Sequence, residues 1–329
     1  MKIAPSPQLL RSKNSAINAW SILFMIIALV TFGLAADFAG YAGSFLRIGS
    51  SARSIAMGSA FTAELDRGFT AYHNPAGVVF LDRKQFTVLH HFLALDRQFF
   101  AASFSTGLPP NAGLGLAWVS SGVKDIDGRS YSGFQTETLS TSEDAIFVTF
   151  ANQIAPGLSF GLNFKLLFHR IPAETENLTG DGIGFDIGIM FRQIPNLNIA
   201  FKVQDINSKY NWNTPDNIDS EDKNYDDYFA TIFRLGGSYT YKKFLFTADY
   251  GYVTDLQEQL NLGSVIRFGG EYTWQEQYFF RAGFGDARIA IGVGMNYSLW
   301  KNKDAYLDYA FVYELPIGIS HVFTYAFNL

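Results

Sequence analysis

Charged side chains recur on the polar faces of alternating apolar–polar segments in the second half of the chain. Acids and bases are mixed in this set, so its chemistry is ion pairing or the binding of an oppositely charged group. If the segments cross a bilayer, the charges must face inwards, because an Arg or Lys facing lipid at the midplane costs about 2–4 kcal/mol. We expect a lumenal ion-pair network, with substrate gating by Arg234, Arg267 or Arg281 against a carboxylate as the alternative. The set comprises Lys165, Asp186, Arg192, Lys202, Arg234, Asp249, Arg267, Glu271, Arg281 and Asp308.

Residue types used in catalysis and metal binding are present, but not in the patterns that those functions need. The histidines are His73, His90, His91, His169 and His321. They have no H-x-x-x-H spacing, and the adjacent His90 and His91 would face opposite sides of a strand. No G-x-S-x-G elbow occurs, Cys is absent, and the acidic segment 216–227 lacks the ligand pattern of a calcium loop. We therefore expect no enzyme activity, no metal and no cofactor.

The segments that must position these charges have the pattern of membrane-spanning strands. Between 158 and 170, Leu and Phe at every second position oppose Ser, Gly, Asn, Lys and His. This period of two indicates strands, and repeated segments of about ten residues with aromatic residues at their ends are typical of transmembrane barrels. We predict an all-β fold, a transmembrane antiparallel β-barrel of about fourteen strands. The strands are expected at 84–94, 97–106, 113–122, 143–153, 158–170, 181–193, 197–206, 228–241, 244–253, 263–275, 277–285, 287–298, 304–314 and 317–329.

The lengths of the connections support this strand assignment. Long polar connections follow the third, fifth and seventh predicted strands, at 123–143, 171–180 and 207–227. Connections after the even-numbered strands are short. Bacterial outer-membrane barrels have short turns on one side and longer loops on the other. The assignment therefore places every long loop on the same side of the membrane.

Composition and the N-terminus narrow the protein class. The net charge of −5 gives no reason to expect a nucleic-acid partner. Only one apolar run approaches the length of a transmembrane helix, and it spans residues 19–36 behind a basic start. This is the pattern of a signal peptide, for which we predict residues 1–35, with an uncleaved anchor as the alternative.

Small residues are concentrated between Ala42 and Gly77, directly before the first predicted strand. They would allow the backbone to pack closely in a confined space, so we interpret the segment as a plug. It ends in Asn74-Pro75-Ala76-Gly77, which has the residue types of a turn.

The order of motifs in this stretch resembles the start of the mature chain in PorV/PorQ-type proteins, outer-membrane barrels related to the FadL long-chain fatty-acid transporters. The motifs are Phe45-Leu46-Arg47-Ile48-Gly49, Ala52-Arg53, Ala56-Met57-Gly58, Ala60-Phe61 and Asn74-Pro75-Ala76-Gly77. The resemblance implies that residues 36–80 fold as a plug inside a barrel of residues 81–329, in the bacterial outer membrane. The residues that we expect to form the plug or a movable hatch are Arg47, Gly49, Arg53, Met57, Gly58, Asn74, Pro75, Ala76 and Gly77.

The resemblance implies two functions. The first is FadL-like passage of small hydrophobic or amphipathic, fatty-acid-like molecules across the outer membrane. The alternative is an accessory role in a type IX-like protein secretion system, with secretion components or cargo as partners. A plugged barrel with a purely structural role is a third reading. Outer-membrane lipid is an expected partner in all three.

Overall fold

The computed structural model describes residues 40–94, 96–172, 177–213, 225–300, 303–314 and 318–329. All of them belong to one compact unit. The predicted signal peptide, 1–35, lies outside the described residues, as does most of the acidic segment 216–227. Among the described residues, no helix combines the length and hydropathy needed to cross a membrane.

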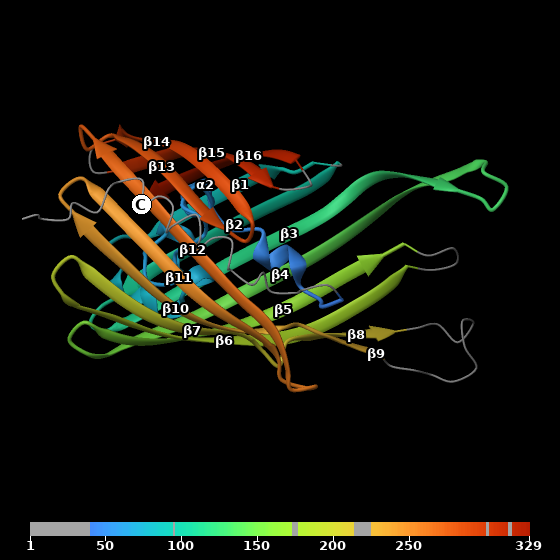
Figure 1. The fold of residues 1–329 in the computed structure, drawn as a ribbon, viewed down its shortest axis with the longest axis horizontal. Coiled ribbons are helices and arrows are strands. Elements are labelled where there is room, and N and C mark those ends of the chain that lie inside the picture. Colours follow the sequence, from blue (N-terminus) through green and yellow to red (C-terminus); the bar gives the residue numbers. More distant parts are fainter. Residues whose placement is uncertain (1–39, 95, 173–176, 214–224, 301–302, 315–317) are drawn as a thin grey trace, which may run out of the picture. The chain divides into compact units, whose positions relative to one another are not determined.

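Antiparallel strands make up most of the described chain (Figure 1). Their order along the sequence is β1 (Gln85–Phe92), β2 (Arg97–Leu108), β3 (Ala112–Arg129), β4 (Gln135–Ala155), β5 (Leu158–Ile171), β6 (Leu178–Ile194), β7 (Leu197–Ile206), β8 (Lys209–Asn213), β9 (Tyr225–Tyr228), β10 (Thr231–Tyr241), β11 (Phe244–Asp255), β12 (Leu260–Trp274), β13 (Tyr278–Gly285), β14 (Arg288–Trp300), β15 (Lys303–Glu314) and β16 (Gly318–Asn328).

The main ring of strands closes on itself, so within the described residues of the ring no strand is left without a neighbour on either side. β1 pairs with β16 from Gln85↔Asn328 to Phe92↔His321, and β7 pairs directly with β10. The short strands β8 and β9 extend from β6 and stand outside the ring. Removing these two from the sixteen leaves a closed barrel of fourteen antiparallel strands, which confirms the predicted fold and strand number.

The two faces of the wall follow the predicted alternation. On β5, Asn163 and Lys165 are fully buried and point inwards, whereas Leu162 and Phe164 are exposed on the outer face. An apolar outer surface is what contact with lipid hydrocarbon requires.

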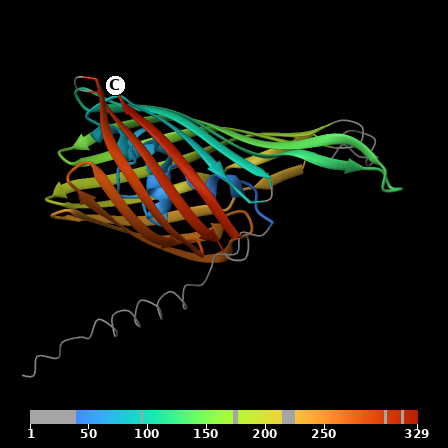
Figure 2. The same ribbon diagram turned by 90° about the horizontal axis from the view of Figure 1, so that it is seen from above.

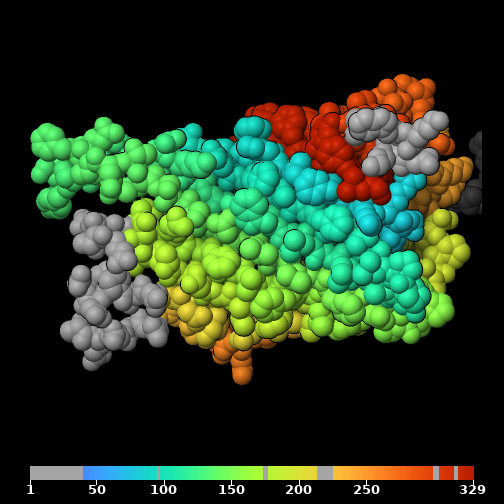
Figure 3. All heavy atoms as spheres, turned by 180° about the vertical axis from the view of Figure 1, so that it is seen from behind, coloured from blue at the N-terminus to red at the C-terminus, as the bar shows by residue number. Residues whose placement is uncertain are grey.

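The connection between the third and fourth strands differs from the prediction. Residues 123–143 were expected to form a loop, but β3 and β4 continue as a paired hairpin to Arg129↔Gln135. Figure 2 and Figure 3 show this green hairpin standing beyond the ends of the other strands. The extension has no apolar face, so side-chain alternation gives no signal there. Main-chain hydrogen bonds between the β3 arm and the Ser- and Thr-rich β4 arm are sufficient to hold it.

The segment that precedes β1 lies inside the ring of strands (Figures 1 and 2). We call residues 42–80 the inner segment. It consists of short helical turns joined by irregular backbone, and most of its residues are buried. Its elements are η1 (Ser44–Arg47), α2 (Ala52–Ala56), η2 (Arg67–Phe69), α3 (Thr70–His73) and η3 (Pro75–Phe80). Phe45, Ile55 and Phe69 pack with Leu89 and Phe99 of the wall in the main apolar cluster.

Glycine allows the inner segment to touch the wall backbone. Gly58 adopts φ +65° and crosses β12 and β13 at Gly269 and Gly283. A Cβ atom at Gly283 would lie only 2.2 Å from the Gly58 nitrogen, and one at Gly269 would lie 2.3 Å from the Met57 oxygen. Side chains at these wall positions would therefore push the inner segment away.

We predict that Gly283→Val destabilises the folded barrel by about 1–3 kcal/mol, the range for overpacking an interior. The measurement is thermal unfolding in detergent, together with limited proteolysis of the inner segment. Gly237→Val is the matched control, because the nearest atom to a Cβ there is 4.0 Å away. Equal unfolding midpoints for the two variants would contradict the close contact.

Candidate functional site

A chain of alternating charges joins the inner segment to the wall. Arg53 of α2 donates to Glu271 of β12, with Nε 3.0 Å from Oε2. Arg281 of β13 reaches the same oxygen at 2.6 Å and Asp308 of β15 at 2.7 Å. Arg67 of η2 pairs with the other oxygen of Asp308 and so returns the chain to the inner segment.

These groups are shielded from water, which makes their pairing obligatory. Asp308 is fully buried, and Glu271 and Arg281 are 6% and 4% exposed. Removing one partner from a buried ion pair typically costs 3–5 kcal/mol, because it leaves an uncompensated charge. The inner segment therefore supplies counter-charges that the wall needs.

A second cluster lies on β5, β6 and β7. Lys165 pairs with Asp186 at 2.7 Å and with Asp205. Lys202 lies 3.3 Å from Asp186 and donates to the Tyr72 carbonyl at 2.8 Å. Asn163 donates to the Ala71 carbonyl at 2.9 Å. Ion pairs therefore join the members of the cluster, and hydrogen bonds connect the cluster to the backbone of α3.

Asp205 was absent from the predicted set, and the reason is geometric. It follows Gln204 on the same strand, so strict alternation would turn it outwards. The residue instead adopts φ +62° where the pairing of β6 with β7 shifts register, and its side chain is 2% exposed. An irregularity of this kind has no sequence signal beyond the Asp that occupies it.

The remaining predicted wall charges have different surroundings. Asp249 accepts from the Thr62 amide at 3.0 Å and from its hydroxyl at 2.7 Å. Arg192 lies near the end of β6, where it donates to Asn198 and lies over the Phe80 ring, outside both ion clusters. Arg267 is paired with Asp286 at 2.7 Å.

The Asn74–Gly77 motif is docked on β5 and β6. The Asn74 side chain accepts from the Ala76 amide at 3.0 Å and donates to the carbonyls of Thr62 and Ile189. Ser159 donates to the Ala76 carbonyl at 2.7 Å. Gly188 leaves room for this arrangement, since a Cβ there would meet the Asn74 Oδ1 at 2.0 Å.

The other predicted residues of the inner segment have structural contacts of their own. Gly49 adopts φ +119° against Ile55, and Met57 is fully buried with Phe61 and Leu245. The backbone oxygen of Arg47 accepts from Arg288 at 3.0 Å.

Asp66 and His73 form a polar centre that the sequence did not reveal. The His73 Nε2 lies 3.0 Å from the Asp66 Oδ2 and 2.8 Å from the Ser50 hydroxyl. Burial lowers the pKa of His73 below its usual value, against the opposing effect of the Asp66 carboxylate. The imidazole is therefore neutral at neutral pH and adds no positive charge to its surroundings.

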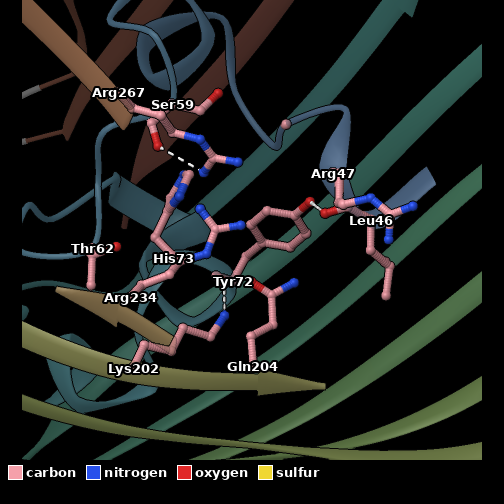
Figure 4. Close-up of a pocket in the computed structure, with 11 residues that line it drawn as sticks. Leu46, Arg47, Ser59, Thr62, Tyr72, His73, Lys202, Gln204, Arg234 and Arg267 are labelled. Carbon is pink, nitrogen blue, oxygen red and sulfur yellow. Dashed lines mark hydrogen bonds between the residues drawn. The ribbon is translucent and has the colours of Figure 1, made fainter. Parts of the chain in front are cut away.

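A cavity of about 30 Å³ lies between the inner segment and the wall. Its lining includes the cationic side chains of Lys202, Arg234 and Arg267 from the wall and of Arg47 from η1, together with Tyr72 (Figure 4). Within the described residues no acidic side chain lines it. Two of the three arginines predicted as possible carboxylate contacts meet here, whereas Arg281 belongs to the ion chain with Glu271.

We predict that Glu271→Gln lowers the free energy of unfolding by about 3–5 kcal/mol, since Arg53 and Arg281 then share an uncharged partner. The measurement is denaturant unfolding in detergent micelles. Arg83→Gln serves as control, because the Arg83–Asp304 pair is 47% and 34% exposed, and such pairs contribute about 0–1 kcal/mol. Similar losses in both variants would show that the ion chain does not hold the fold.

Comparison with known proteins supports the fold. No family model and no curated protein matches the sequence. Among solved structures, the "CymD monoaromatic hydrocarbon channel" matches with a TM-score of 0.60 and 12% identity, over 86% of this chain and 98% of that one. The Pseudomonas putida toluene transporter TodX matches with a TM-score of 0.59 and 12% identity, over 84% of this chain and 98% of that one. The Ralstonia pickettii toluene transporter TbuX matches with a TM-score of 0.58 and 12% identity, over 85% of this chain and 98% of that one. This chain has the barrel fold of these channels.

Proposed function

We propose that this protein is an outer-membrane barrel that passes small hydrophobic or amphipathic molecules. The observation that carries the proposal is the closed fourteen-stranded barrel, which is similar to a hydrocarbon channel and two toluene transporters over nearly their whole length. The PorV/PorQ resemblance of the inner segment remains a second, sequence-based argument for an outer-membrane location after cleavage of residues 1–35.

The wall has the surface of a protein that is solvated by lipid. Leu116, Phe150, Phe246 and Ile291 are each more than half exposed on four different strands. A soluble protein rarely exposes so continuous an apolar surface, whereas a barrel in lipid requires one. Outer-membrane lipid is therefore the partner that we assign to the outer face.

We propose that the inner segment is a plug that must shift before a molecule crosses. Besides its apolar contacts around Phe45 and Phe69, it is held to the wall by hydrogen bonds and ion pairs, among them Arg53–Glu271 and Thr62–Asp249. Water can replace the polar partners when the lumen hydrates, so these contacts do not by themselves prevent displacement. The Asn74–Gly77 motif, docked through side-chain and main-chain hydrogen bonds, is the hatch in this proposal.

A disulfide tether tests the movement. A Cβ atom at Gly115 on β3 would lie 3.2 Å from the Ala71 Cβ of α3, which a small adjustment brings into the range of disulfides. The chain has no Cys, so Ala71→Cys with Gly115→Cys allows only this bond. We predict that the oxidised double variant loses at least ten-fold in the rate of radiolabelled toluene or fatty-acid uptake by cells.

Reduction should restore uptake in the tethered variant, and each single Cys variant should behave as wild type. Uptake that is the same with and without the gene would refute passage itself. Normal uptake by the fully oxidised double variant would instead refute movement of α3 while leaving passage in place.

The projecting β3–β4 hairpin favours a second candidate, an accessory role in protein secretion. Tyr131 at its tip is fully exposed and Phe134 is 75% exposed, far from the apolar outer face of the barrel. Exposed aromatic residues on a projecting element are typical of protein contact sites.

Deletion of residues 125–140 tests this second candidate. If the hairpin contacts secretion components or cargo, a pull-down with the shortened barrel from its own cells should recover at least ten-fold less of these partner proteins. Toluene uptake should be unchanged, because the deletion lies outside the barrel ring. Unchanged recovery of partner proteins would contradict the accessory role.

A further inference from the structure

Arg234 is a buried cation that has no ion-pair partner in the part of the chain that the structure describes. It is 8% exposed on β10, and none of the described residues forms a hydrogen bond with its Nε atom. Within the described residues its guanidinium forms no ion pair with any carboxylate. Burial of an unpaired guanidinium is strongly unfavourable, so its retention in the barrel interior calls for a ligand or a functional use.

The groups around Arg234 are already neutralised or bonded. Lys202 is compensated by Asp186, and Arg267 by Asp286. The Tyr72 hydroxyl donates to the Leu46 carbonyl, and burial lowers the pKa of His73, so that its ring is neutral. Arg47 donates to the Ala42 carbonyl at 3.3 Å. Among the described residues, Arg234 is thus the cation of this lining that forms no ion pair and no hydrogen bond.

The nearest competing acid is Asp249 on the neighbouring strand. One of its oxygens accepts two hydrogen bonds from Thr62, which hold the carboxylate towards the inner segment. Its other oxygen accepts no hydrogen bond from the described residues and forms no ion pair with Arg234. Arg234 is therefore directed to the cavity and not locked in a wall ion pair.

We propose that this cavity binds the carboxylate group of an organic monoanion, with Arg234 as its principal contact. The planar guanidinium matches a carboxylate through two parallel hydrogen bonds. One guanidinium balances the single charge of a carboxylate, whereas a phosphate brings more charge than Arg234 alone balances. A space of about 30 Å³ accepts the head group alone, and the rest of the ligand lies outside it.

This inference rests on the proposed function only for the way in which the ligand reaches the cavity. Bound there, the carboxylate contacts both the wall and residues of η1 and α3. A ligand at this site can therefore influence the position of the inner segment. It stabilises whichever position of the segment it binds more tightly.

Ligand-observed NMR titration of the purified protein in zwitterionic nanodiscs tests the site. The probes are benzoate and its neutral near-isostere benzamide, with inorganic phosphate as a third arm. We expect wild type to bind benzoate at least ten-fold more tightly than benzamide, and more tightly than phosphate. Arg234→Gln should weaken benzoate binding by about 10- to 100-fold, the usual effect of losing a charged hydrogen bond, and leave benzamide unchanged.

Arg234→Lys keeps the charge without the planar fork and should give an intermediate loss, while Arg83→Gln should match wild type. Equal binding of benzoate and benzamide by wild type overturns the proposal, and so does phosphate binding at least as tightly as benzoate. An Arg234→Gln variant that unfolds more readily but keeps its benzoate affinity shows that Arg234 only balances Asp249, which also overturns it. If Arg234→Gln does not fold, the test depends on two other measurements. These are the ratio of benzoate to benzamide affinity in wild type and the benzoate affinity of Arg234→Lys.

These outcomes are separate from those of the uptake experiment. Benzoate binding is measured without transport, and toluene uptake involves no carboxylate. A barrel that passes toluene but does not distinguish benzoate from benzamide refutes only the carboxylate site. Selective benzoate binding without any uptake refutes only passage.

Discussion

Burial of charge is the interaction on which the rest of this structure depends. The outer face of the barrel ring is apolar, as contact with hydrocarbon requires, so charged side chains on the ring strands must point inwards. Inside the ring they are removed from water and need partners, and the wall alone does not supply enough of them. The inner segment completes the pairing by placing Arg53 beside Glu271 and Arg67 beside Asp308. The barrel wall and the inner segment therefore neutralise each other's buried charges.

Polar anchoring and close packing make different demands on the inner segment. Ion pairs and hydrogen bonds fix its position, yet each can be exchanged for water or for a ligand. Backbone contact at Gly58, Gly269 and Gly283 requires the absence of side chains and has no substitute. The apolar cluster around Phe45 and Phe69 adds to these contacts, so the inner segment is firmly seated against the wall.

Arg234 stands out against this background of satisfied charges. Lys165, Lys202, Arg267 and Arg281 all have carboxylate partners at short range. The exception lies in the cavity that separates the inner segment from the wall, where a ligand would contact both. The proposed specificity for a carboxylate depends on this unpaired guanidinium, which a neutral molecule would leave without a counter-charge.

Much of this architecture follows from the sequence by itself. The strand number follows from counting the alternating segments and their connections. The inward face of Lys165 or Asp186 follows from a period of two, which is a local property that lipid makes strict. Other features depend on contacts between distant residues. The pairing of Arg53 with Glu271, the inward turn of Asp205 at a register shift and the paired β3–β4 extension were decided by which strands became neighbours. The unpaired state of Arg234 is also decided by tertiary structure. Its possible partners lie on several strands and on the inner segment, and no local sequence pattern encodes the distances between them.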